Sequence, residues 1–184
     1  MHGMREREIE VPRFLHEIHG ERASPFAVAL VYVTGVVFGV LALAFAWSRV
    51  AELPWWKSLL LFLVAADVSG GAVANFSRGT DAYYGGRPLL RWGFIFVHAA
   101  WPAVLFLFFD GRLAYWVFLY VYTVAAASVV NVIPQRERQE VAAAALLALG
   151  IVILLPLGLD VPFLAWFPPV FMTKIILAFA VRRS

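Results

Sequence analysis

The sequence predicts an all-α integral membrane protein with six transmembrane helices and both termini on the cytoplasmic side. Three observations carry this prediction. The chain of 184 residues is 62% hydrophobic and 15% charged, whereas soluble domains are about 45–50% apolar and about 25% charged. Six apolar runs have the length of a spanning helix, and arginines gather in alternate connections between them. A soluble core of this size cannot take up so much apolar surface, so lipid must be the solvent.

Residues 1–24 form a charged tail before the first apolar run. That run is too long, and its leader too rich in glutamate, for a cleaved signal peptide, so we expect a retained anchor. The tail segment EVPRFLHEIHGERA predicts a short interfacial helix on the cytoplasmic membrane surface, with His16 and His19 on a solvated face. Their spacing of three residues is not that of the zinc-protease motif, which needs four. The chain thus divides into this tail and a transmembrane domain, 25–184.

The six predicted spans are close to the length of about 20 residues that crosses a bilayer core as an α-helix. They lack the alternation of lipid-facing barrel strands, and their short connections predict antiparallel neighbours. Gly35 and Gly39 in the first span form a GxxxG pair, a candidate face for helix packing or for a homodimer through span one. The predicted spans are 25–47, 56–73, 90–109, 113–132, 141–159 and 162–181.

The positions of Lys and Arg predict the orientation. Of the 15 such residues, eleven lie in the tail, in the connections after the second and fourth spans, and at the C-terminus, and three lie in the opposite connections. Positive residues in short loops mark the cytoplasmic side. The sequence therefore predicts a multi-pass protein of the cell (plasma or inner) membrane with N- and C-termini cytoplasmic.

Three ionisable residues lie inside the predicted spans. Asp67 and His98 are each seven or eight residues from the polar end of their spans, and Lys174 is eight residues before Arg182. At about 1.5 Å per residue, all three lie about 10–12 Å inside the same boundary. A charge at a helix centre costs about 2.5–3.5 kcal/mol, so Asp67 and Lys174 should pair or face a wet cavity, although Lys174 could also snorkel. We predict that the three converge in a polar crevice of the cytoplasmic half, as candidate catalytic residues.

A donor-rich mouth is predicted at the entrance of this crevice. The connection NFSRGTDAYYGGRPLLR carries three arginines that suit phosphate or carboxylate groups, and its glycines are expected to allow tight turns and close approach to a ligand. A competing interpretation is that these arginines follow the positive-inside rule and bind anionic headgroups at about 1 kcal/mol each. The candidate ligand-binding residues are Asn75, Arg78, Thr80, Tyr83, Tyr84, Arg87, Arg91, Tyr120 and Asn131.

Three functions are consistent with these residues. In the first, the protein binds, and could chemically process, a small amphiphilic or lipid-like ligand with an anionic head, with His98 as general acid or base, Asp67 orienting it and Lys174 stabilising negative charge. The alternatives are a non-catalytic membrane subunit or assembly factor, whose polar cluster only fixes helix register, and a small proton-coupled transporter. His98 could equally be a buried hydrogen bonder. Whether the protein is an enzyme stays open.

Several kinds of site are excluded. Cysteine is absent, which removes disulfides, thiolate metal sites and iron–sulfur clusters. His98 is the only histidine within a predicted span, so a haem pair, a zinc site or a di-iron cluster lacks ligands, and we predict no metal and identify no cofactor. Without a basic segment interleaved with aromatic residues, nucleic acid is not an expected partner. Membrane lipids are.

Overall fold

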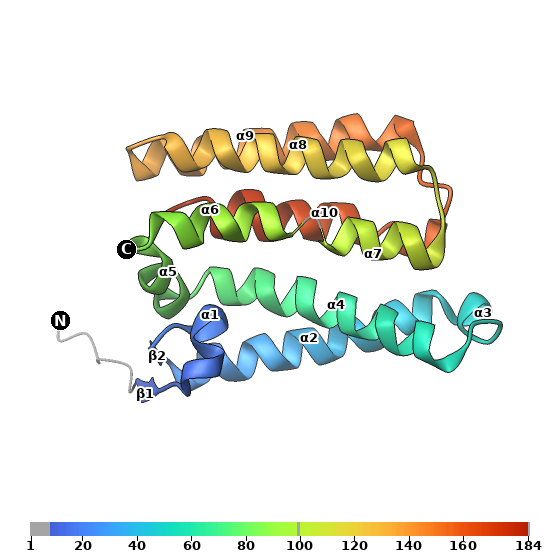
Figure 1. Cartoon of the computed structure of the whole chain (residues 1–184), viewed down its shortest axis with the longest axis horizontal. Coiled ribbons are helices and arrows are strands. Elements are labelled where there is room, and N and C mark those ends of the chain that lie inside the picture. The colour runs from blue at the N-terminus through green and yellow to red at the C-terminus, as the bar shows by residue number, and fades with distance from the viewer. Residues whose placement is uncertain (1–7, 99, 184) are drawn as a thin grey trace.

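The computed structural model describes residues 8–98 and 100–183, which fold almost entirely as helices (Figure 1). Within this described part, six helical segments are long and apolar enough to cross a membrane, which indicates a polytopic membrane protein. Each overlaps one predicted span, so the prediction of an all-α six-helix bundle is confirmed; the cytoplasmic placement of the termini stays a prediction. The segments are Pro25–Phe45, Trp55–Asn75, Pro88–Phe109, Leu113–Val132, Arg136–Leu157 and Pro162–Phe179.

In the view of Figure 1, helices α2 (Pro25–Phe45) and α4 (Trp55–Asn75) lie at one side of the bundle and helices α8 (Leu113–Val132) and α9 (Arg136–Leu157) at the other. Helices α2 and α4 pack closely against each other and are joined through the short helix α3 (Trp47–Val50). The third and last spans lie between the two pairs. The first strand and the C-terminal residues lie at the same end of the bundle, as an even number of spans requires (Figure 1).

The third span is divided in two. Helix α6 (Pro88–Val97) ends with His98 as its C-terminal cap, and helix α7 (Ala100–Phe109) continues toward the other end of the bundle. The sequence suggested one continuous helix with His98 in its interior. The division instead places His98 at a helix end, where backbone carbonyls lack their usual partners.

The last span also departs from a regular α-helix. It begins with a short 3₁₀ turn, η2 (Pro162–Leu164), continues as α10 (Phe167–Met172) and ends as a π-helical stretch, η3 (Thr173–Phe179). The wider turn is visible at its end, where the Ala180 N–H donates to the carbonyl five residues earlier, at 3.0 Å. π-Helical turns are rare and are frequent at functional sites. Lys174 lies in this one.

The hydrophobic core holds the last span firmly in place. Trp116 of α8 and Phe167 and Phe171 of α10 are each at most 2% exposed, and the two phenylalanine rings stack with centroids 5.2 Å apart. Buried aromatic side chains contribute the largest apolar areas of a core. Apolar packing alone therefore holds the last span, which carries Lys174, in its place in the bundle.

The GxxxG pair of the first span packs against another helix of the same chain. A Cβ on Gly35 would lie 3.1 Å from the Ala66 carbonyl oxygen, and one on Gly39 would lie 2.6 Å from the Phe62 ring, both on α4. The small residues thus let α2 and α4 approach closely. A homodimer through span one stays a prediction, and it would have to use another face of α2.

The N-terminal segment folds into a small lobe, residues 8–24, instead of a single interfacial helix. Strands β1 (Ile9–Glu10) and β2 (Arg22–Ala23) pair antiparallel, and between them lie a 3₁₀ turn, η1 (Arg13–Leu15), and a four-residue helix, α1 (His16–His19). The lobe packs on helix α5, Arg78–Gly85, which Ser77 caps by accepting the Thr80 N–H at 3.3 Å. The predicted glycine-rich loop after the second span is therefore largely helical.

Two glycines allow the lobe and α5 to touch through their backbones. A Cβ on Gly79 would lie 2.2 Å from the His19 carbonyl oxygen, and Gly20, with φ of 76°, faces Gly79 from the lobe. This contact draws His19 inward until it is 2% exposed, with its Nε2 atom 3.3 Å from the Tyr32 hydroxyl. The expectation that His19 lies on a solvated face is therefore wrong, because a packed lobe replaces the isolated helix.

We expect Gly79→Ala to detach the lobe from α5, because the new methyl group would occupy the position of backbone carbonyl oxygens. Overpacking of this kind costs about 1–3 kcal/mol or more. Gly86→Ala is the matched control, since its Cβ would meet nothing within 4 Å. Amide hydrogen exchange over residues 8–23 should quicken in the first variant and not in the second. Equal protection in both would contradict this packing.

The lobe should also loosen in acid. Burial lowers the pKa of His19 below its ordinary value of 6.5. A detached lobe would restore the ordinary pKa, so as the pH falls below about 6.5 the detached state binds more protons and packing is weakened; above that pH both states are neutral and the effect vanishes. Opening free energies from hydrogen exchange should fall between about pH 7.5 and pH 5.5, and His19→Phe should remove this dependence. A dependence that persists in the variant would assign it to another group.

Candidate functional site

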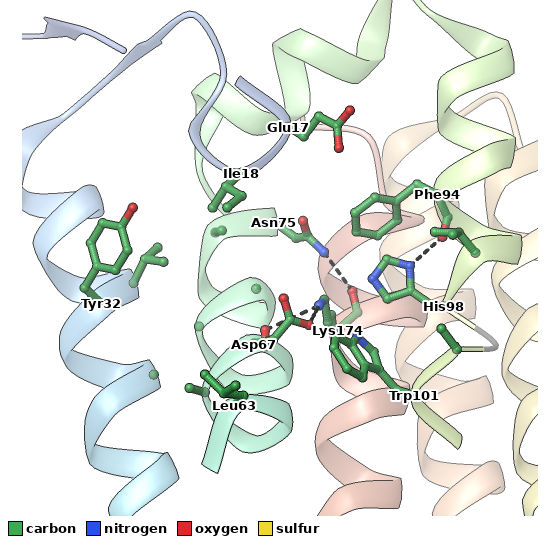
Figure 2. A pocket seen from close by; sticks show the side chains of 18 of the residues that line it. Glu17, Ile18, Tyr32, Leu63, Asp67, Asn75, Phe94, His98, Trp101 and Lys174 are labelled. Atoms are coloured by element: carbon green, nitrogen blue, oxygen red, sulfur yellow. Dashed lines mark hydrogen bonds and ion pairs between the residues drawn. The ribbon is translucent and has the colours of Figure 1, made fainter. Parts of the chain in front are cut away.

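A cavity of about 620 Å³ lies between the first three spans. Its walls come from α2, α4, α6 and α7, with η3 behind it and α1 of the lobe at one end (Figure 2). Most of its lining is apolar, including Val36, Leu63 and Val97, which are also exposed on the outer surface. The cavity therefore opens sideways, through the surface that would face lipid.

An ion pair forms the polar floor of this cavity. The Lys174 Nζ atom lies 2.7 Å from the Asp67 Oδ2 atom and donates a second, longer bond of 3.3 Å to the Asp67 carbonyl oxygen. Lys174 is 3% exposed, whereas 44% of the Asp67 side chain is exposed. The carboxylate thus faces the cavity and the amine lies behind it. The predicted pairing of Asp67 with Lys174 is present, while their catalytic role stays a prediction.

The face of α4 that carries Asp67 is built to receive the lysine. Asp67, Gly71 and Asn75 recur every four residues, so they share this face. A Cβ on Gly71 would lie 2.7 Å from the Lys174 Nζ atom, so a larger residue here would displace the end of the lysine side chain. The Asn75 side chain donates to the Lys174 carbonyl oxygen at 3.2 Å. These contacts fix the π-helical stretch against α4.

His98 lines the same cavity from the other side. Its Nδ1 atom lies 2.6 Å from the Phe94 carbonyl oxygen and donates to it, one turn back in α6, because this carbonyl can only accept. In the neutral ring, Nε2 is then an acceptor. His98 is 8% exposed, and Figure 2 places it across the cavity from Asp67, with Lys174 between them. An acid, an amine and an imidazole from three spans therefore meet in one hollow, as their depth predicted.

Few of the predicted ligand-binding residues line the cavity. Asn75 and Tyr84 do, and the Tyr84 hydroxyl donates to the Glu17 carbonyl oxygen at 3.4 Å. Some of the others hold the lobe: Arg87 pairs with Glu21 at 3.2 Å and lies over the Tyr83 ring. The Thr80 hydroxyl and the exposed Arg78 at the start of α5 also lie outside the lining. So does the Tyr120 hydroxyl, which donates to the Phe96 carbonyl oxygen at 3.2 Å.

Arg91 belongs to a second, separate polar cluster. Its guanidinium donates to the Asn131 side-chain oxygen at 2.6 Å and to the carbonyl oxygens of Phe179 and Ala180, at 2.7 and 3.0 Å. It also lies 3.8 Å from the Asp81 carboxylate. The last carbonyls of a helix need donors from outside the helix, and Arg91 supplies them at the end of η3. Arg91 and Asn131 are thus bonded to each other and to groups outside the cavity, while the buried Arg91 Nη1 atom makes no hydrogen bond within the described residues and lies 3.8 Å from Asp81.

The C-terminal residues complete this second cluster. The Arg183 N–H donates to Asp81 Oδ2 at 2.7 Å, and the Arg182 N–H donates to the Gln139 side-chain oxygen at 2.9 Å. Gln139 is 1% exposed and joins α9 to the end of α8 by donating to the Ile133 carbonyl oxygen at 2.9 Å. Sequence reasoning missed Gln139, because it lies just before the predicted span 141–159, whereas α9 begins at Arg136.

Sequence reasoning also missed the contribution of the lobe to the cavity. Glu17 and Ile18 of α1 and Tyr32 of α2 line it, and Phe94 and Trp101 add aromatic surface. Nothing in the local pattern of the tail indicates that it folds back over α4. Across residues 8–98 and 100–183, no three His, Asp or Glu side chains come together as a metal ion would require.

Comparisons of the chain with protein families, with curated proteins and with solved structures find no match.

Proposed function

We propose that this membrane protein binds a single-chain amphiphile in the sideways-opening cavity, with the polar head at the Asp67–Lys174 pair and His98. The observation that carries the proposal is the combination of a mostly apolar hollow of about 620 Å³ with one polar floor. Ligand sites are typically clefts of about 300–1,000 Å³, mainly apolar, with a few convergent polar groups. An intramembrane acid or lysine is by default a candidate functional group.

The arrangement suits a molecule that enters from the bilayer. Val36, Leu63 and Val97 would contact its hydrocarbon chain at the opening, and the aromatic rings of Phe94 and Trp101 would contact it further in. Its head would then reach the carboxylate that faces the cavity. The lobe, through Glu17 and Ile18, closes one end of this path.

The proposal keeps the amphiphile of the sequence-based hypothesis and drops its dependence on an anionic head. That head depended on Arg78, Arg87 and Arg91, and none of the three lines the cavity. Arg87 is paired with the lobe and Arg91 caps the last span. Among the described residues, no arginine that would recognise phosphate or carboxylate lines the cavity.

Two neighbouring valines provide the test. Val36 lines the cavity and Val37 does not, although their exposures are similar, at 54% and 51%. Purified protein in detergent micelles would be titrated with oleyl alcohol, oleyl sulfate and oleylamine, and the bound species counted by native mass spectrometry. We expect saturable binding of at least one probe, weakened by about tenfold or more in Val36→Trp, a loss of about 1.4 kcal/mol, and unchanged in Val37→Trp. Absence of saturable binding of all three, or equal loss in both variants, would overturn the proposal.

A further inference from the structure

We infer that the head group selected by the cavity is an uncharged hydroxyl that donates to His98 or Asp67 and accepts from Lys174. This inference rests on the proposed function and names the ligand class of the same site. It follows from two features of the polar floor: the sign of its charges and its unused hydrogen-bonding capacity.

The charges of the floor oppose a charged head of either sign. The Asp67 carboxylate and the Lys174 amine lie 2.7 Å apart, so the pair is neutral as a whole. An anionic head would meet the exposed Asp67 carboxylate, and Glu17, which lines the lobe end of the same cavity, adds a second negative charge (Figure 2). A cationic head would compete with Lys174 for the same carboxylate and be repelled by it. A neutral dipolar group avoids both penalties.

The unused hydrogen-bonding groups match a hydroxyl. A lysine ammonium has three N–H donors, and two of those of Lys174 are used on the Asp67 carboxylate and carbonyl oxygens, which leaves one. On the accepting side, the Nε2 atom of His98 and the Oδ1 atom of Asp67 take part in no hydrogen bond within the described chain. The floor thus offers one donor and two acceptors around one space. A hydroxyl, with one donor and two lone pairs, satisfies both kinds at once.

The geometry also selects against isosteres that lack the proton. A buried site built to donate to and accept from a hydroxyl is left with an unpaired acceptor when the proton is missing, and such sites discriminate strongly. An alkyl methyl ether keeps the accepting oxygen and removes the donor. It is therefore the sharpest comparison with the alcohol.

The test is competition among probes that share one chain. Radiolabelled oleyl alcohol bound to the purified full-length protein would be displaced by unlabelled oleyl alcohol, oleyl methyl ether, oleyl sulfate and oleylamine. We expect the alcohol to bind at least about tenfold more tightly than each of the other three. If the sulfate, the amine or the ether binds as tightly as the alcohol, the hydroxyl assignment is wrong while the proposed function stands. If none of the four binds saturably, the proposed function itself fails.

His98→Phe separates the contribution of the head group to binding from the contribution of the hydrocarbon chain. This variant should weaken binding of the alcohol by about tenfold. Binding of the ether should be almost unchanged, because the ether has no proton to donate. His16→Phe is the matched control: this histidine, bonded to the Val11 carbonyl oxygen at 2.8 Å, does not line the cavity. Should His98→Phe not fold, the ranking of the four probes by the wild-type protein still decides the matter. An equal loss for alcohol and ether would assign His98 a packing role only.

Discussion

Asp67→Ala should destabilise the protein by about 3 kcal/mol, because it leaves the Lys174 amine buried without its counter-charge. Removing one partner of a buried pair typically costs about 3–5 kcal/mol. The lower end applies because the Asp67 carboxylate is itself half-exposed to the cavity, whereas Lys174 is only 3% exposed. Unfolding in mixed micelles, with increasing dodecyl sulfate as the denaturant, would measure the change.

A second substitution distinguishes a lost pair from a lost packing contact. Lys174→Met retains most of the volume of the lysine and removes its charge. If the pair is the cause, the double variant should be considerably more stable than Asp67→Ala alone, since no buried charge is left. If the loss of stability in the double variant equals the sum of the losses in the two single variants, the charges do not interact. Asp160→Asn, which breaks the exposed pair with Arg112 at 2.8 Å, should change stability by less than about 1 kcal/mol.

Arg91→Leu should be at least as damaging, by about 3 kcal/mol or more, because several buried acceptors lose their donor together. The Asn131 side-chain oxygen and the carbonyl oxygens of Phe179 and Ala180 all accept from this guanidinium. Each buried polar group left unsatisfied costs about 1–3 kcal/mol. The same denaturation assay applies, together with hydrogen exchange at the end of the last span, where fraying should be greatest.

The control for Arg91 is the conservative change. Arg91→Lys keeps the positive charge near Asp81 but cannot reproduce the planar fork that reaches three acceptors. It should recover only part of the loss. If Arg91→Lys is as stable as the wild type, charge alone matters and the capping of η3 contributes nothing. If Arg91→Leu lowers amphiphile binding without lowering stability, then Arg91 serves the cavity and not the fold.

The fold could be predicted from the sequence because membrane spans depend on length and hydropathy, which are local properties. The meeting of Asp67, His98 and Lys174 could also be anticipated, since a fixed rise per residue converts position in a helix into depth. All three line the cavity, although their chemical roles stay predictions.

The arginines could not be assigned in this way. A guanidinium that caps a helix end, as Arg91 does, has the same sequence signature as one that faces a ligand. The difference depends on the irregular end of the last span, which is a property of the packed structure. The lobe escaped prediction for a similar reason. The contact between Gly20 and Gly79 joins segments far apart in the chain, and each glycine alone indicates only flexibility.

The π-helical stretch η3, Thr173–Phe179, makes the chain sensitive to its exact length at this point. Each such turn holds one residue more than an α-turn, and that residue sets the rotation between Lys174, which serves the cavity, and Phe179, which serves Arg91. Deleting one residue between them, such as Leu177, would let the segment return to ordinary winding and swing one of the two ends out of place. Among sequences related to this one, exchanges between aliphatic residues should be frequent within η3, whereas insertions and deletions there should be rare.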